Sequence, residues 1–101
     1  MDIKDLESRM HEFVEGKGWY EVGSPKKQSP RNLAVSLMIE AAEVLEHFQW
    51  REQPVDLTDL SDELADVALY LLQLASVLDI DLESAILNKL AKNQDRDWPA
   101  D

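Results

Sequence analysis

Two pairs of carboxylates interrupt apolar helical sequence in residues 36–70: Glu40 with Glu43, and Glu63 with Asp66. Residues three apart lie on one face of an α-helix, about one turn from each other, so each pair presents its oxygens together. Carboxylates that converge beside an apolar core repel one another and lose hydration unless a cation or protons compensate them. Mg²⁺ takes carboxylate and water oxygens and leaves positions for a phosphate. The pairs are therefore candidate Mg²⁺ ligands, with Mn²⁺ as a substitute.

The alternative interpretation is structural, because acidic residues three apart are common on solvated helix faces. Two features favour the metal. The pair is repeated on a second predicted helix, and the short turn between the two helices contains Pro54, which suits antiparallel packing.

Composition limits the classes of function. The 101 residues predict a single domain, 1–101, with a small core, and the apolar fraction of 45% is that of a folded chain. A formal net charge of −11 argues against a nucleic acid polymer as partner. It leaves room for a small phosphorylated ligand, because bound divalent metals invert the local sign of charge.

Location is predicted to be cytoplasmic. The chain has no cysteine, which suits a reducing compartment and excludes thiolate zinc, iron–sulfur clusters and disulfides. The first residues, MDIKDLESRMHEF, lack the apolar core of a secretory signal. The longest apolar-rich run, Val67 to Leu78, is too short to span a bilayer, so no membrane association is expected.

The apolar spacing predicts an all-α fold, a four-helix bundle-like protomer, with helices at about 2–16, 30–52, 57–78 and 82–96. Ser29 followed by Pro30, and Asp81 further on, are expected N-caps. Glycines and prolines make residues 16–30 the main irregular segment.

The third predicted helix indicates an assembly. Between Leu64 and Leu78 apolar residues occur all round the helix, and such a helix must be buried on every side. Three partner helices in so short a chain can hardly cover it, so we expect a homo-oligomer that uses this helix.

Helical spacing extends both acidic pairs into longer stripes, namely Ser36, Glu40, Glu43, His47 and Trp50 on the second helix, and Asp59, Glu63, Asp66 and Tyr70 on the third. Each pair is thus followed by an aromatic side chain. An aromatic ring beside a metal site can stack on a flat ligand such as a nucleobase, although residues such as Trp50 and Tyr70, taken alone, are more often core or interface residues.

The fourth predicted helix carries a basic and amide stripe: Lys89, Lys92, Asn93 and Arg96. Lysine and arginine can contact phosphate oxygens, and asparagine can bond a base or a sugar. A solvated helix end, with cations favourably placed near its C-terminus, would look the same.

Other sites have less support. A di-iron carboxylate bundle would need Glu-x-x-His, but Val44 stands three residues before His47. Neither histidine belongs to a His-Glu-x-x-His motif, and none of the three glycines opens a phosphate-binding loop.

Together these residues resemble the MazG-like branch of the all-α nucleoside triphosphate pyrophosphohydrolases, and within it the short dCTP pyrophosphatase-type proteins. The resemblance covers nearly the whole chain. It is carried by SPRNL at 29–33, Glu40-x-x-Glu43, FQW at 48–50, Glu63-Leu64-Ala65-Asp66, Tyr70, and Lys89-x-x-x-Asn93-x-x-Arg96.

The resemblance implies an enzyme that cleaves dCTP or a modified deoxynucleoside triphosphate to monophosphate and pyrophosphate, as part of nucleotide-pool cleaning. It implies that the four carboxylates bind Mg²⁺, which holds the triphosphate and activates a water. It implies a dimer or tetramer, of which we favour the homotetramer. The implied contacts are Lys89, Asn93 and Arg96 for phosphate or nucleotide polar groups, and His11, Trp19, Trp50 and Tyr70 for the base pocket.

This chemistry agrees with the residue inventory, because cleaving a phosphoric anhydride needs charge neutralisation and an in-line water more than a protein nucleophile. One carboxylate would serve as general base, and Glu40 or Glu43 is our choice. Two alternatives remain open. The chain is a non-catalytic acidic helical module for oligomerisation or protein binding, or it is related to the dimeric dUTPases, which share the acidic helices.

Overall fold

The computed structural model describes residues 1–99, which form four helices and no strand. They are α1 (Ile3–Gly16), α2 (Pro30–Glu46), α3 (Leu57–Val77) and α4 (Leu82–Asp95). The predicted all-α class is therefore confirmed. No helix within this part of the chain is both long and apolar enough to cross a membrane.

Side-chain caps explain where the helices begin. Ser29 accepts a hydrogen bond from the Asn32 amide with Pro30 in the first turn, and Asp81 accepts one from Ser84, so both predicted N-caps are confirmed. α3 ends in a Schellman arrangement, with Ile80 N donating to Ala75 O at 2.8 Å and the intervening Asp79 at a φ of 56°.

The second helix ends earlier than expected. It stops at Glu46, with His47 as the C-cap, so the prediction that it continues to Glu52 is wrong. The amides of His47 and Phe48 bond to carbonyls three residues back instead of four, at 3.2 and 2.9 Å, which tightens the chain into turns. Trp50 consequently leaves the helical face of the acidic pair and is 84% exposed.

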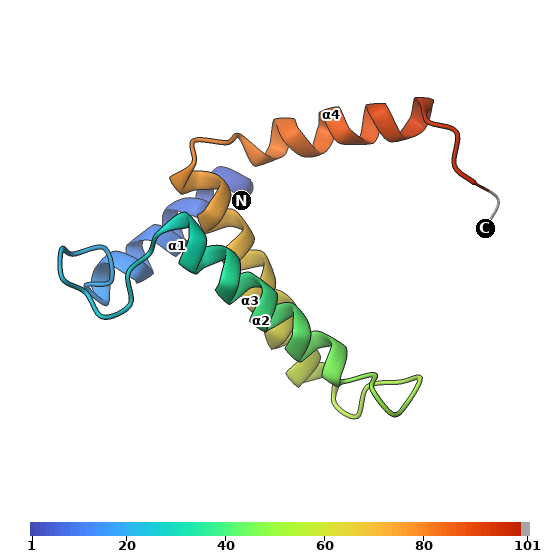
Figure 1. The fold of residues 1–101 in the computed structure, drawn as a ribbon, viewed down its shortest axis with the longest axis horizontal. Coiled ribbons are helices and arrows are strands. Elements are labelled where there is room, and N and C mark those ends of the chain that lie inside the picture. The colour runs from blue at the N-terminus through green and yellow to red at the C-terminus, as the bar shows by residue number, and fades with distance from the viewer. Residues whose placement is uncertain (100–101) are drawn as a thin grey trace.

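The core lies where α2 and α3 pack side by side and antiparallel, with α1 crossing near the C-terminal end of α3 (Figure 1). The buried apolar side chains in residues 1–99 are few: Met10, Val14, Leu33, Leu72 and Ala75. The α2–α3 contact is the most extensive of the helix pairs, so it is the rigid part of the fold that can position opposing side chains.

The fourth helix projects away from the other three, joined to them at the end of α3 (Figure 1). It buries none of its residues, and Leu87 and Leu90 are 60% and 55% exposed. The Cα radius of gyration is 16.3 Å. A compact domain of this length would have about 13 Å. The single chain therefore has four helices but only three of them packed as a bundle.

Candidate functional site

The four predicted carboxylates lie on the two helices that pack most closely, Glu40 and Glu43 on α2 and Glu63 and Asp66 on α3. Their proximity shows in the electrostatics of one of them. Burial raises the pKa of the Glu40 carboxyl, and a hydrogen bond with Glu43 and the charges of Glu43, Asp66 and Glu63 raise it further. The structure thus brings the two acidic pairs into one cluster.

Two oxygens of this cluster are buried, Glu40 Oε2 and Glu63 Oε2, and within the described residues the Glu40 oxygen has no partner. The Glu63 oxygen contacts His47 Nε2, an ion pair when that histidine is protonated. A buried carboxylate oxygen with no donor is costly unless a proton or a cation compensates it. The donor set of this cluster, carboxylate oxygens on two facing helices, is the kind that suits Mg²⁺.

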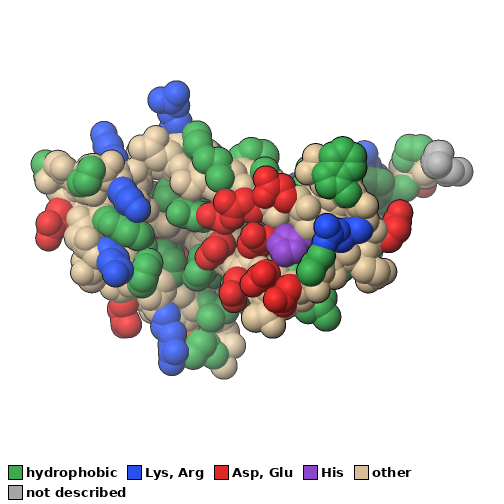
Figure 2. All heavy atoms as spheres, turned by 90° about the horizontal axis from the view of Figure 1, so that it is seen from below, with side chains coloured by type: hydrophobic (Ala, Val, Ile, Leu, Met, Phe, Trp, Pro, Cys, Tyr) green, Lys and Arg blue, Asp and Glu red, His purple; other side chains and the backbone are tan. Residues whose placement is uncertain are grey.

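An acidic cavity of about 220 Å³ opens beside these side chains and is lined by Glu43, Glu46, His47, Arg51, Val55 and Glu63. Figure 2 shows acidic side chains gathered around a histidine on one face of the molecule. Within residues 1–99, no three Asp, Glu, His or Cys side chains are arranged as a ready-made coordination shell. Metal binding at this cluster would therefore require side-chain movement.

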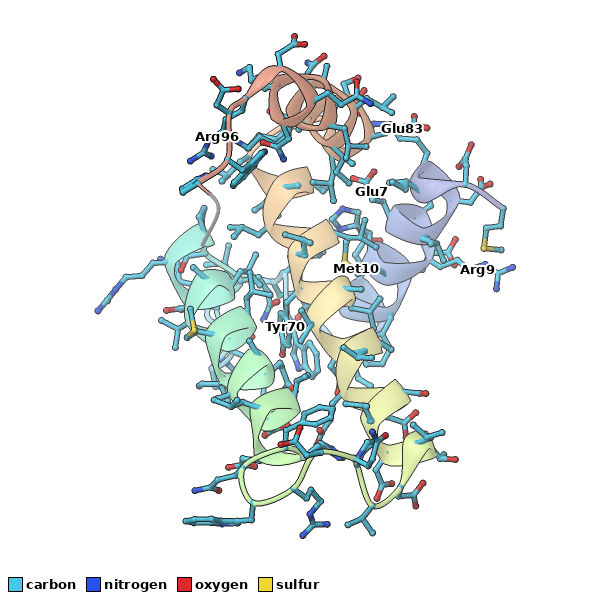
Figure 3. All side chains as sticks on the ribbon, turned by 90° about the vertical axis from the view of Figure 1, so that its right-hand side faces the viewer. Glu7, Arg9, Met10, Tyr70, Glu83 and Arg96 are labelled. Atoms are coloured by element: carbon cyan, nitrogen blue, oxygen red, sulfur yellow. The ribbon has the colours of Figure 1, made fainter. Side chains whose placement is uncertain are left out.

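A second, apolar cavity of about 300 Å³ lies between α1, α3 and the loop that joins α1 to α2. Met10 and Phe13 of α1, Trp19 of the loop, and Asp66 and Tyr70 of α3 line it. Figure 3 shows Met10 between α1 and α3, and Tyr70 on the side of α3 that faces α2. Asp66 thus belongs both to the acidic cluster and to the wall of a cavity with aromatic sides.

A third cavity, the loop cavity, has about 310 Å³ and shares Trp19, Gln28 and Tyr70 with the apolar cavity. Lys26 and Lys27 also line it, which places cationic side chains close to the two aromatic rings. Lys26 Nζ lies 4.8 Å from the centre of the Trp19 ring, a cation–π distance.

A hydrogen-bonded chain that sequence reasoning missed ties the loop to α1 and α3. His11 Nδ1 is 2.6 Å from Tyr20 OH and His11 Nε2 is 2.7 Å from Ser76 Oγ, while Gln73 Nε2 donates to Tyr20 OH at 3.2 Å. Burial raises the pKa of the Tyr20 phenol, which therefore remains neutral. The sequence does contain a signal for a functional role of Gln73. This residue stands three positions after Tyr70 on the same helical stripe and is polar in an apolar run.

The predicted base-pocket residues separate in the structure. Trp19 and Tyr70 line the same two cavities, whereas His11 serves in the hydrogen-bonded chain and Trp50 stands exposed after α2. Among the residues predicted to contact phosphate, Arg96 stacks 4.0 Å from the centre of the Trp98 ring. Arg96 is the C-cap that follows α4, and Figure 3 shows it well separated from Tyr70.

The rest of the predicted basic stripe also lies on α4, at Lys89, Lys92 and Asn93. Asn93 Oδ1 is buried without a partner in the described residues. The three cavities described above contain no residue of α4. Within one chain, the stripe and the acidic cluster are therefore not brought together.

Comparison with known proteins gives relatives of one kind. The chain is 31% identical over 103 residues to dCTP pyrophosphatase 1 of Rattus norvegicus and 32% identical over 107 residues to that of Homo sapiens. These alignments cover 93% and 97% of this chain but 58% and 59% of the relatives. The chain thus spans less than two thirds of the length of the curated relatives it matches.

A solved structure agrees in fold along nearly the full length. The crystal structure of a pyrophosphatase from Archaeoglobus fulgidus DSM 4304 superposes with a TM-score of 0.74 at 35% sequence identity, covering 91% of this chain and 88% of that one. The model of the MazG-like family matches residues 35–101, which include the acidic pairs of α2 and α3. The chain therefore belongs to the MazG-like family.

Proposed function

We propose that this chain is a Mg²⁺-dependent nucleoside triphosphate pyrophosphohydrolase that converts dCTP or a modified deoxynucleoside triphosphate to monophosphate and pyrophosphate. The observation that carries the proposal is the double placement of Asp66, whose charge helps to raise the pKa of the Glu40 carboxyl and whose side chain also lines the apolar cavity. One helix face thereby joins a cluster suited to a phosphate-bound cation to an aromatic-sided space suited to a base. The dCTP pyrophosphatase relatives support the same reaction.

In this function Glu43, Glu63 and Asp66 would hold Mg²⁺, which neutralises phosphate charge and makes a bound water a stronger nucleophile. The buried Oε2 atoms of Glu40 and Glu63 support a cation at this cluster. The raised pKa of Glu40 suits a proton acceptor, and we assign it the general-base role. Trp19 and Tyr70 would stack on the base, and Lys26 and Lys27 of the loop cavity would attract the negatively charged triphosphate.

The first prediction concerns the products. Purified protein with Mg²⁺ and dCTP should release monophosphate and pyrophosphate in equal amounts, with no diphosphate or free phosphate as primary product. Chelation by EDTA should stop the reaction, and Mg²⁺ or Mn²⁺ should restore it. Anion-exchange separation of the products checks this. A folded protein that cleaves no nucleotide with either metal would support the acidic binding module instead.

We further propose that the active form is a homo-oligomer, with the tetramer favoured over the dimer. The single chain exposes 7939 Å² of surface. A compact monomer of this size exposes about 5,800 Å², so roughly 2,000 Å² is in excess, which is the scale of obligate interfaces. Much of the excess is apolar: Met38, Leu45, Leu64, Leu87 and Leu90 are all more than half exposed. Association in the cytoplasm would bury these faces.

The second prediction tests this assembly. Light scattering at micromolar concentration should give a mass that is a multiple of the chain mass. Leu87→Asp should weaken association, because it places a charge on the exposed apolar face of α4. Asn88→Asp is the matched control, adding the same charge at the next exposed position. A monomer in the unmodified protein, or equal weakening by both variants, would contradict the proposed interface.

A further inference from the structure

The hydrogen bonds around Gln73 determine which atom of its side-chain amide, the nitrogen or the oxygen, already has partners within the protein. The backbone carbonyl of Lys26 can only accept, so the Gln28 atom that lies 2.6 Å from it is Nε2. Gln28 therefore turns its Oε1 toward Gln73, 2.7 Å away. An oxygen there requires a donor opposite, so the Gln73 atom that faces it is Nε2.

The second hydrogen of the same Gln73 nitrogen is also committed, because Nε2 donates to Tyr20 OH at 3.2 Å. A side-chain amide has two donor hydrogens and one acceptor oxygen. Both donors are therefore used within the protein, and within residues 1–99 the Oε1 atom makes no hydrogen bond. Gln73 is only 3% exposed, yet it lines the apolar cavity. The Oε1 atom of Gln73 therefore remains available to accept a hydrogen bond from an occupant of that cavity.

The position of this acceptor follows from α3. Glu63, Asp66, Tyr70 and Gln73 succeed one another at spacings of three, four and three, so they share one face of the helix. Seven residues separate Asp66 from Gln73, a rise of about 10 Å. That separation is comparable with the length of a nucleoside from its 5′-phosphate to the outer edge of its base. With the phosphates at the acidic cluster and the base beside Tyr70, the outer edge of the base reaches Gln73.

We propose that Gln73 is a specificity-determining residue whose Oε1 accepts a hydrogen bond from the exocyclic amino group of a cytosine base. This inference rests on the proposed pyrophosphohydrolase function and assigns its base selectivity to one side chain. The amino group of cytosine lies on the outer edge of the ring, opposite the bond to the sugar. Uracil carries a carbonyl oxygen in that place, and two acceptors facing each other repel.

The first test uses the unmodified protein and compares kcat/KM for dCTP, dUTP and N4,N4-dimethyl-dCTP. The value for dCTP should exceed that for dUTP by on the order of 10- to 100-fold, because loss of a buried hydrogen bond leaves its partner unpaired. The dimethyl analogue keeps the cytosine ring but has no amino hydrogen, so its kcat/KM should fall to about the level of dUTP. Efficient turnover of the dimethyl analogue would overturn the proposal.

The second test uses Gln73→Met, which keeps an unbranched side chain of similar length but has no amide. Its kcat/KM for dCTP should fall on the order of 10- to 100-fold while the value for dUTP changes little, so the ratio collapses toward one. Tyr20→Phe is the matched control. It removes one partner of Gln73 but leaves Gln28 to orient the amide, so the dCTP-to-dUTP ratio should be retained.

The failures are distinguishable. If the unmodified protein cleaves no nucleoside triphosphate, the proposed function fails. If it cleaves dCTP and Gln73→Met lowers kcat/KM for both substrates equally, the residue only holds the loop, and this inference fails while the function stands. If Gln73→Met does not fold, the analogue series with the unmodified protein decides the matter alone.

Discussion

Replacing Glu63 by glutamine is expected to lower the rate of pyrophosphate release by on the order of 10²- to 10³-fold while the protein stays folded. The reason is the buried Oε2 of Glu63 in the acidic cluster, where it contacts His47 Nε2. Glutamine has nearly the same shape, so packing between α2 and α3 is kept, but the charge that would balance a phosphate-bound cation is lost. Pyrophosphate release from dCTP and thermal unfolding followed by circular dichroism measure the two properties.

Asp62→Asn provides the control for this variant. Asp62 precedes Glu63 on α3, is exposed, and loses the same single charge. It should retain the activity of the unmodified chain, because a lone exposed carboxylate contributes little to a site it does not face. Retained activity in Glu63→Gln would show that its pair is structural. An equal loss of activity in both variants would show that activity depends on the net charge of the protein and not on the acidic cluster.

The His47–Glu63 contact helps to explain why the acidic cluster tolerates its own repulsion. The two atoms belong to the C-cap of α2 and the second turn of α3, so the pair closes the end of the antiparallel helices beside the acidic cavity. A protonated imidazole there supplies one positive charge to a cluster of four carboxylates. The remaining repulsion is left for protons or a bound cation to relieve.

Sequence predicts the local features well, because they depend on neighbouring residues. Ser29 and Asp81 begin helices by accepting hydrogen bonds from amides three residues later, and the acidic pairs meet because the consecutive helices α2 and α3 pack against each other. The end of α2 is different. Apolar spacing continues through Phe48 and Trp50, but i→i+3 hydrogen bonds replace the helical ones after Glu46, and periodicity carries no signal for that change.

Tertiary placement is the part that sequence does not predict. The basic stripe of α4 has residue types that suit phosphate binding. The direction of α4, however, depends on the change of chain direction at Asp79 and on the surface that covers Leu87 and Leu90. Gln73 shows the opposite case. Its position on the stripe was readable, but its importance depends on Gln28 and Tyr20, which come from a loop 45 and 53 residues away in sequence. Long-range contacts of this kind have no local pattern.

Replacing Glu40 by glutamine is expected to stabilise the metal-free protein at neutral pH and to inactivate it at the same time. The folded-state pKa of Glu40 is raised above its usual 4.5 by burial and by the neighbouring carboxylates. The folded state therefore binds this proton more tightly than the unfolded chain does. The resulting stability is fully present below pH 4.5 and is lost as pH rises through the raised pKa. Glutamine, neutral at every pH, avoids that loss.

In EDTA, the melting temperature of Glu40→Gln should therefore match that of the unmodified protein near pH 4 and exceed it at pH 7. A gain of about 4–8 °C corresponds to roughly 1 kcal/mol in a domain of this size. Glu12→Gln, which removes one exposed charge from α1, should show no such pH-dependent gain. Mg²⁺ should raise the melting temperature of the unmodified protein more than that of Glu40→Gln, since a ligand stabilises only the state that binds it.

The two effects of this substitution have opposite signs for one physical reason. A carboxylate placed where it destabilises the empty fold gains most from a cation, so the same charge that costs stability without metal supplies affinity with it. If Glu40→Gln instead lowers the melting temperature at pH 7, the carboxylate holds α2 against α3 and is a structural element. If it keeps full pyrophosphohydrolase activity, the general base is another member of the cluster, and Glu43, which hydrogen-bonds to Glu40, becomes the next candidate.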